Sequence, residues 1–140
     1  MTHASQQIFV YSSLRSGFHH PAYAYISRYF ELVAEASVQG KLFDLGDNIV
    51  GVPSQESVFI QGELYTIKAE ASFSWAIAQL DDYEGIQNDE QGEPLYRRSL
   101  TTVFYNGQTT IAWVYWFNRT VTEGHFIESG DILTYLAQKK

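Results

Sequence analysis

Glu84 is the residue whose position raises a chemical question. It lies near the end of residues 80–85, which read Leu-Asp-Asp-Tyr-Glu-Gly. On a helical wheel at about 100° per residue, Phe73, Ile77 and Leu80 form a narrow apolar stripe, and Glu84 falls on the same stripe. A carboxylate facing a core is costly unless it is paired, solvated in a cavity or put to use. Two interpretations follow: a general base at the rim of a cavity, or a frayed helix end that reaches solvent.

Two other segments contain residue types suited to binding. Residues 9–15 read as a buried strand that runs into a small-residue loop, Ser12-Ser13, whose backbone N–H groups could form an anion-binding concavity. A Ser-Ser pair is equally typical of an ordinary turn. Arg97 and Arg98 follow Tyr96, and because neighbouring strand residues face opposite sides, one arginine could reach inward to a carboxylate. The alternative is an edge strand with a solvated basic pair.

Several other chemistries lack the residues that they need. The chain has no cysteine, which excludes disulfides, thiolate catalysis and Cys-ligated zinc. Its four histidines have no partners at metal-ligand spacing, so no metal site is expected. No Ser-His-Asp arrangement, phosphate-binding glycine loop or dinucleotide fingerprint can be inferred.

The composition indicates a globular protein with a substantial core. We expect one domain over residues 1–140, since 45% of the chain is hydrophobic and only 18% is charged. Ten tyrosines bring hydroxyls to an apolar interior, as suits a cavity for a small ligand. The formal charge of −7 argues against binding to nucleic acid or to an anionic membrane surface. The N-terminus does not resemble a signal peptide and no apolar run is long enough to span a membrane, so a cytoplasmic location is expected.

The periodicity predicts more strands than helices. Residues 21–33 and 70–84 show helical stripes, and a short helix is expected near residues 131–137. Asn106-Gly107 is a strong hairpin signal. Gly40 and Gly62 occur in matching contexts, which indicates bulges or close backbone approaches in neighbouring strands. The predicted strands cover residues 8–11, 38–45, 58–67, 95–105 and 109–117. The fold predicted is α+β, a small mixed, strongly curved, barrel-like sheet of about five to six strands with two principal helices.

Six motifs in order resemble the gamma-glutamylcyclotransferase-like family, including its gamma-glutamylamine cyclotransferase and AIG2-like branches. They occupy residues 10–14, 39–44, 62–65, 80–85, 96–98 and 112–115. The resemblance covers about residues 8–136. It implies a curved, barrel-like sheet around a cavity, with Glu84 as the catalytic acid/base. It also implies that the loop formed by Tyr11, Ser12, Ser13 and Leu14 binds substrate through its backbone.

The chemistry implied by this resemblance is an intramolecular aminolysis. The free α-amine of a gamma-glutamyl substrate attacks the γ-carbonyl, which gives 5-oxoproline and a released amine. Tyr11, Tyr96 and Tyr115 are candidates for lining the cavity, and no metal or organic cofactor is required. The family usually has glycine where this chain has Ser12. This departure favours the alternative, a non-catalytic module on the same scaffold that binds a small ligand or a partner. These motifs specify neither the leaving amine nor an oligomeric state.

Overall fold

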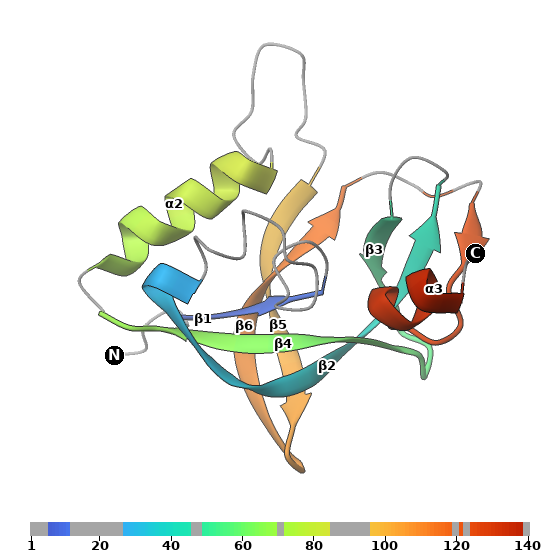
Figure 1. Cartoon of the computed structure of the whole chain (residues 1–140), viewed down its shortest axis with the longest axis horizontal. Coiled ribbons are helices and arrows are strands. Elements are labelled where there is room, and N and C mark those ends of the chain that lie inside the picture. Colours follow the sequence, from blue (N-terminus) through green and yellow to red (C-terminus); the bar gives the residue numbers. More distant parts are fainter. Residues whose placement is uncertain are drawn as a thin grey trace.

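Five strands close into a barrel in the computed structural model of this chain (Figure 1). The structure describes residues 6–11, 27–45, 49–69, 72–84, 96–118, 121 and 124–138, without the side chains of residues 82–84, 133 and 138. The barrel strands are β1 (Gln7–Val10), β2 (Phe30–Asp44), β4 (Phe59–Ile67), β5 (Tyr96–Tyr105) and β6 (Gln108–Phe117). Their order is β2-β4-β1-β6-β5, and β2 pairs again with β5 through Ser37–Phe104 and Val38–Val103. The α+β barrel predicted from the sequence is therefore confirmed.

Strand β1 lies in the middle of this sheet. It is antiparallel to β4 and parallel to β6, so Ile8 has Tyr65 on one side and Trp113 on the other. Because both edges of β1 are paired, the end of this strand at Val10 is held in the sheet, and the predicted substrate loop follows it in the sequence. The last described residue before that loop is Tyr11, which is only 6% exposed.

Strand β2 is longer than the pattern predicted. The helical stripe expected to run to residue 33 is wrong for Phe30 and Val33, because β2 begins at Phe30. Residues 27–29 are helical and lead directly into the strand, whereas residues 21–26 lie outside the described part. The start of β2 pairs with the end of β4, and a register shift between Leu32 and Ala34 breaks the two-residue alternation there. That irregularity makes the segment look helical in the sequence.

Two short strands extend the far half of β2. Strand β3 (Ile49–Pro53), which the pattern did not predict, pairs with the end of β2 from Gly40 to Asp44. Strand β7 (His125–Phe126) pairs with the same end through Phe43 and Asp44. The described residues thus form seven strands, of which five make up the closed barrel and two, β3 and β7, extend β2.

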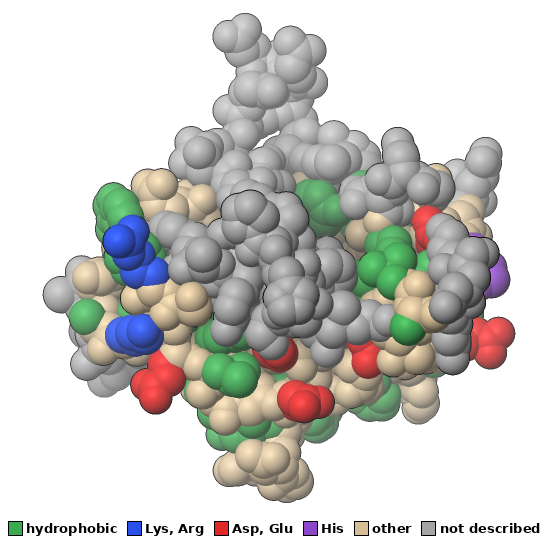
Figure 2. Space-filling view, in the orientation of Figure 1, with side chains coloured by type: hydrophobic (Ala, Val, Ile, Leu, Met, Phe, Trp, Pro, Cys, Tyr) green, Lys and Arg blue, Asp and Glu red, His purple; other side chains and the backbone are tan. Residues whose placement is uncertain are grey.

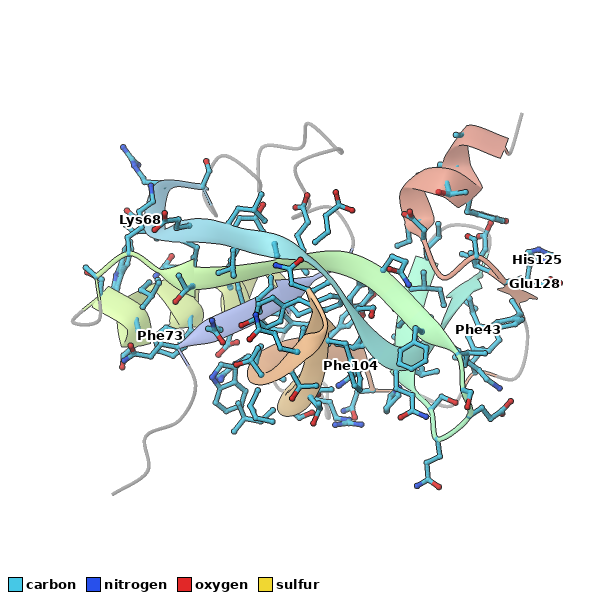
Figure 3. The ribbon with its side chains drawn as sticks, turned by 90° about the horizontal axis from the view of Figure 1, so that it is seen from below. Phe43, Lys68, Phe73, Phe104, His125 and Glu128 are labelled. Atoms are coloured by element: carbon cyan, nitrogen blue, oxygen red, sulfur yellow. The ribbon has the colours of Figure 1, made fainter. Side chains whose placement is uncertain are left out.

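Helices α2 and α3 lie at opposite ends of the barrel (Figure 1). Helix α2 (Phe73–Glu84) and helix α3 (Ile132–Gln138) agree with the predicted segments. Figure 3 shows Phe73 at the α2 end, and Phe43, His125 and Glu128 at the α3 end. Neither helix is long and apolar enough to cross a membrane.

Two apolar clusters hold these elements together. One fills the barrel and is built around Phe9, Leu42, Leu64, Val114 and Trp116, all at most 1% exposed. The other lies between the sheet and α2 and contains the inward-facing helix residues Ala76, Ile77 and Leu80. The predicted stripe of Phe73, Ile77 and Leu80 is confirmed, since all three pack into this second cluster. Burial of this stripe fixes the rotation of α2 against the sheet.

The paired glycines are close-approach positions. Gly40 lies in β2 and Gly62 in β4, and these strands are neighbours as the sequence echo indicated. A Cβ on Gly62 would collide with the carbonyl oxygen of Val10 and the ring of Phe9. The predicted hairpin turn is also present: Asn106 and Gly107 both have positive φ, at 49° and 75°.

Candidate functional site

An ion pair joins β5 to the last turns of α2. The Nε of Arg98 donates to Oδ1 of Asp81 at 2.7 Å, and its Nη2 donates to Oδ2 at 2.9 Å. This is the bidentate geometry in which a guanidinium binds a carboxylate most strongly. The guanidinium also lies over the ring of Trp113, with Cζ 4.3 Å from the centroid. Arg98 is thus the arginine of the basic pair that reaches a carboxylate, whereas Arg97 is exposed.

Tyr115 connects this ion pair to the start of the predicted substrate loop. It is 4% exposed, and its hydroxyl donates to Oδ1 of Asp81 at 2.8 Å. Its backbone carbonyl accepts a hydrogen bond of 2.5 Å from the hydroxyl of Tyr11. One residue of β6 therefore touches both α2 and the residue that opens the loop.

The ring of Tyr11 is held on several sides. It packs at a ring-centroid distance of 6.3 Å from Phe9 and 6.4 Å from Trp116. Gly51 lies against its edge, where a Cβ would come within 2.7 Å of the phenol oxygen. These contacts determine where the chain leaves the sheet after β1.

The remaining predicted site residues are described only in part. Ser12, Ser13 and Leu14 lie outside the described residues, as does the side chain of Glu84, although the backbone of Glu84 ends α2. Tyr96 begins β5 and is partly buried, with its ring edge-on to Phe117 at a centroid distance of 5.7 Å. The structure thus brings Tyr11 and Tyr115 into contact with each other. The roles predicted for Glu84, the loop and Tyr96 remain predictions.

The sequence did not single out a second buried carboxylate, Glu63. It is 7% exposed, and its Oε1 accepts a hydrogen bond of 2.9 Å from the hydroxyl of Tyr65. It lies opposite Val10 in the β1–β4 pairing, beside the start of the loop. Its place in the Gly-Glu-Leu-Tyr motif was visible, but the burial of all four residues of this motif depends on strand neighbours that are distant in sequence.

A metal site would require several His, Asp or Glu side chains close together. Among the residues that the structure describes, no three His, Asp or Glu side chains are arranged to hold a metal ion. On the face seen in Figure 2, the described acidic side chains are spread over the lower part and the right side, whereas Lys and Arg lie at the left.

The structural class of this protein is a closed barrel with a flanking helix, α2, that is hydrogen-bonded to β5 and β6 through Asp81. Residues 8–134 match the family described as gamma-glutamyl cyclotransferase, AIG2-like, and the chain belongs to that family. No protein of curated function matches the chain.

Solved structures with this fold come from distant organisms. YkqA from Bacillus subtilis aligns with a TM-score of 0.68 and 24% identity over 98% of this chain, which spans 44% of the YkqA chain. The uncharacterized protein PH0828 from Pyrococcus horikoshii aligns with a TM-score of 0.62 and 20% identity, over 97% of this chain and all of that one. An AIG2-like protein from Mus musculus aligns with a TM-score of 0.62 and 18% identity, over 87% of this chain and 83% of that one. At these identities the likeness is one of fold.

Proposed function

We propose that this chain catalyses the intramolecular aminolysis of a gamma-glutamyl amide or amine. The α-amine nitrogen attacks the γ-carbonyl carbon and forms the five-membered ring of 5-oxoproline. The bond from that carbon to the leaving nitrogen then breaks. A proton passes from the attacking nitrogen to the departing amine, so the reaction needs no oxidant, reductant or second substrate.

Glu84 is the proposed acid/base of this reaction. The substrate amine arrives as an ammonium and must lose a proton before it can attack, and a positioned carboxylate can take that proton and return it to the leaving nitrogen. The neighbouring positions one turn earlier, Leu80 and Asp81, are 1% and 9% exposed and face the sheet. This register supports a carboxylate on the sheet side of α2.

The loop of residues 11–14 is the proposed substrate-binding element. Its backbone N–H groups would hold the substrate carboxylate or the oxyanion that develops on the γ-carbonyl. Holding the substrate in a folded shape supplies much of the rate, because the reacting groups belong to one molecule.

A single observation carries the proposal: Tyr115 contacts both Tyr11 and Asp81. The residue that opens the proposed substrate loop and the helix that ends in the proposed base are therefore held by one buried residue, the first through its backbone carbonyl and the second through its hydroxyl. Catalysis between a loop and a helix requires this kind of fixed separation.

The test is release of 5-oxoproline from a panel of gamma-glutamyl amines and dipeptides. We expect the wild-type protein to act on at least one of them and Glu84→Gln, which keeps the shape and removes the base, to be inactive. The matched control is Glu128→Gln, an exposed site at the opposite end of the barrel (Figure 3), which should retain full activity. An active Glu84→Gln variant would sink the assignment.

A second candidate function is non-catalytic binding of a small ligand or partner by the same site. Ser12, which stands where the family usually has glycine, favours it, since a side chain there narrows the site or constrains the loop. Absence of 5-oxoproline with the whole panel, together with thermal stabilisation by one of its members, would select this function.

A further inference from the structure

We infer that Arg98, Asp81 and Tyr115 form a positioning unit that sets the last turn of α2 relative to the loop beginning at Tyr11. The inference rests on the proposed function, because that function gives Glu84 and the loop their roles. None of the three residues is proposed to touch the reacting atoms. They act through Glu84, which lies three residues after Asp81.

The first argument concerns the charge at the C-terminal end of α2. Helix termini leave carbonyl groups unsatisfied and fray, and the last turn of α2 has no basic residue to offset the negative end of its dipole. Arg98 brings a positive charge to this end from β5. In the described part of α2, Ala76, Ile77 and Leu80 make apolar contacts with the sheet, and Asp81 adds the ion pair with Arg98.

The second argument is geometric. Asp81 accepts two hydrogen bonds from Arg98 and one from Tyr115, and Arg98 is itself held over the ring of Trp113. Charge compensation alone would need only one flexible contact. Three directed hydrogen bonds and a stacked guanidinium fix the carboxylate in space, which lysine could not reproduce. The arrangement therefore specifies orientation in addition to stabilising the ion pair.

The third argument is that Tyr115 divides its contacts between the two halves of the site. Its hydroxyl holds Asp81, whereas its backbone carbonyl holds Tyr11. Removing the Tyr115 hydroxyl should release the helix and leave the loop in place. Removing the Tyr11 hydroxyl should do the reverse, so two isosteric variants separate the two contacts.

The kinetic test compares Tyr115→Phe with Tyr11→Phe. A displaced base weakens the chemical step, so Tyr115→Phe and Arg98→Lys should lower kcat by on the order of 10- to 100-fold with KM within about twofold of wild type. Tyr11→Phe should mainly raise KM. Arg97→Met, which removes the adjacent exposed arginine, should change neither constant.

A loss of overall stability must be separated from a loss of position. Val103 belongs to the cluster that fills the barrel and not to the one that packs against α2. Val103→Ala therefore provides a destabilised control, which should lower Tm while kcat at 25 °C stays unchanged. Hydrogen exchange provides a readout that needs no substrate: the amides of residues 81–84 should exchange faster in Tyr115→Phe and Arg98→Lys but not in Val103→Ala.

If the wild-type protein is active, an unchanged kcat in Tyr115→Phe and Arg98→Lys would overturn the inference. Unchanged hydrogen exchange at residues 81–84 in these variants would overturn it as well. The proposed function fails by a different result, namely an active Glu84→Gln variant or a wild-type protein that releases no 5-oxoproline. In that case the exchange measurement still decides whether the three residues position the end of α2.

Discussion

Gly51 of β3 lies against the edge of the Tyr11 ring, so close that a Cβ at position 51 would fall 2.7 Å from the phenol oxygen. A larger residue at position 51 would therefore clash with a side chain that lies forty residues earlier in the chain. The contact joins β3 to the residue that opens the predicted substrate loop, although the strand that β3 pairs with in the described part of the chain is β2.

We predict that Gly51→Ala displaces the Tyr11 ring and weakens its hydrogen bond to the Tyr115 carbonyl. The expected result is a KM raised by about three- to tenfold for the gamma-glutamyl substrate, with a stability loss of about 1–3 kcal/mol from overpacking. Steady-state kinetics and urea denaturation measure the two effects. Gly107→Asn, at an open turn position with positive φ, is the control and should leave KM unchanged.

The Arg98–Asp81 pair should contribute to stability as well as to position. Its side chains are 22% and 13% exposed, so Asp81→Ala leaves a guanidinium poorly solvated and should lower the free energy of unfolding by about 2 kcal/mol. The exposed pair Lys41–Glu56 is the comparison, since Glu56→Ala should cost less than about 0.5 kcal/mol. Equal losses in the two variants, measured by urea denaturation, would contradict the distinction.

Gly62 should tolerate no side chain. A methyl group there would meet the backbone of Val10 and the ring of Phe9, which cannot move without separating β1 from β4. We expect Gly62→Ala to lower the free energy of unfolding by about 3 kcal/mol or more and to raise exchange in β1. Retention of wild-type Tm by this variant would show that β1 can shift to make room.

The α3 end of the barrel should affect stability without affecting catalysis. The hydroxyl of Tyr135 donates to Oδ2 of Asp44 at 2.6 Å, and Asp44 is 8% exposed. Tyr135→Phe removes this bond and should cost about 1–2 kcal/mol. Because α2 lies at the opposite end (Figure 1), kcat and KM for 5-oxoproline release should stay at the wild-type values.

Local patterns predicted the elements that depend on local interactions. The stripe of α2 and the Asn106-Gly107 turn are determined by residues a few positions apart, and both appear as predicted. The start of β2 was misread because Phe30 and Val33 fit a helical spacing, whereas their actual neighbours lie in β4. Strand β3 was missed because five residues carry too little periodicity to stand out.

In the candidate site, too, contacts between residues close in sequence could be predicted better than contacts between distant ones. The sequence indicated that one arginine of the pair could reach a carboxylate, and Arg98 does so. It could not indicate the two contacts of Tyr115. The contact with Tyr11 follows from the parallel pairing of β1 with β6, and the contact with Asp81 follows from the packing of α2 against the sheet. The burial of Glu63 depends on another long-range pairing, that of β1 with β4.

The central place of β1 has a consequence for how the protein is made. Its residues are synthesised before those of both its partners, β4, which ends at Ile67, and β6, which ends at Phe117. Contacts of such high sequence separation slow folding. During translation the apolar residues 8–10 therefore lack their parallel neighbour until β6 has been synthesised, and chaperone binding to this nascent segment would protect it from aggregation.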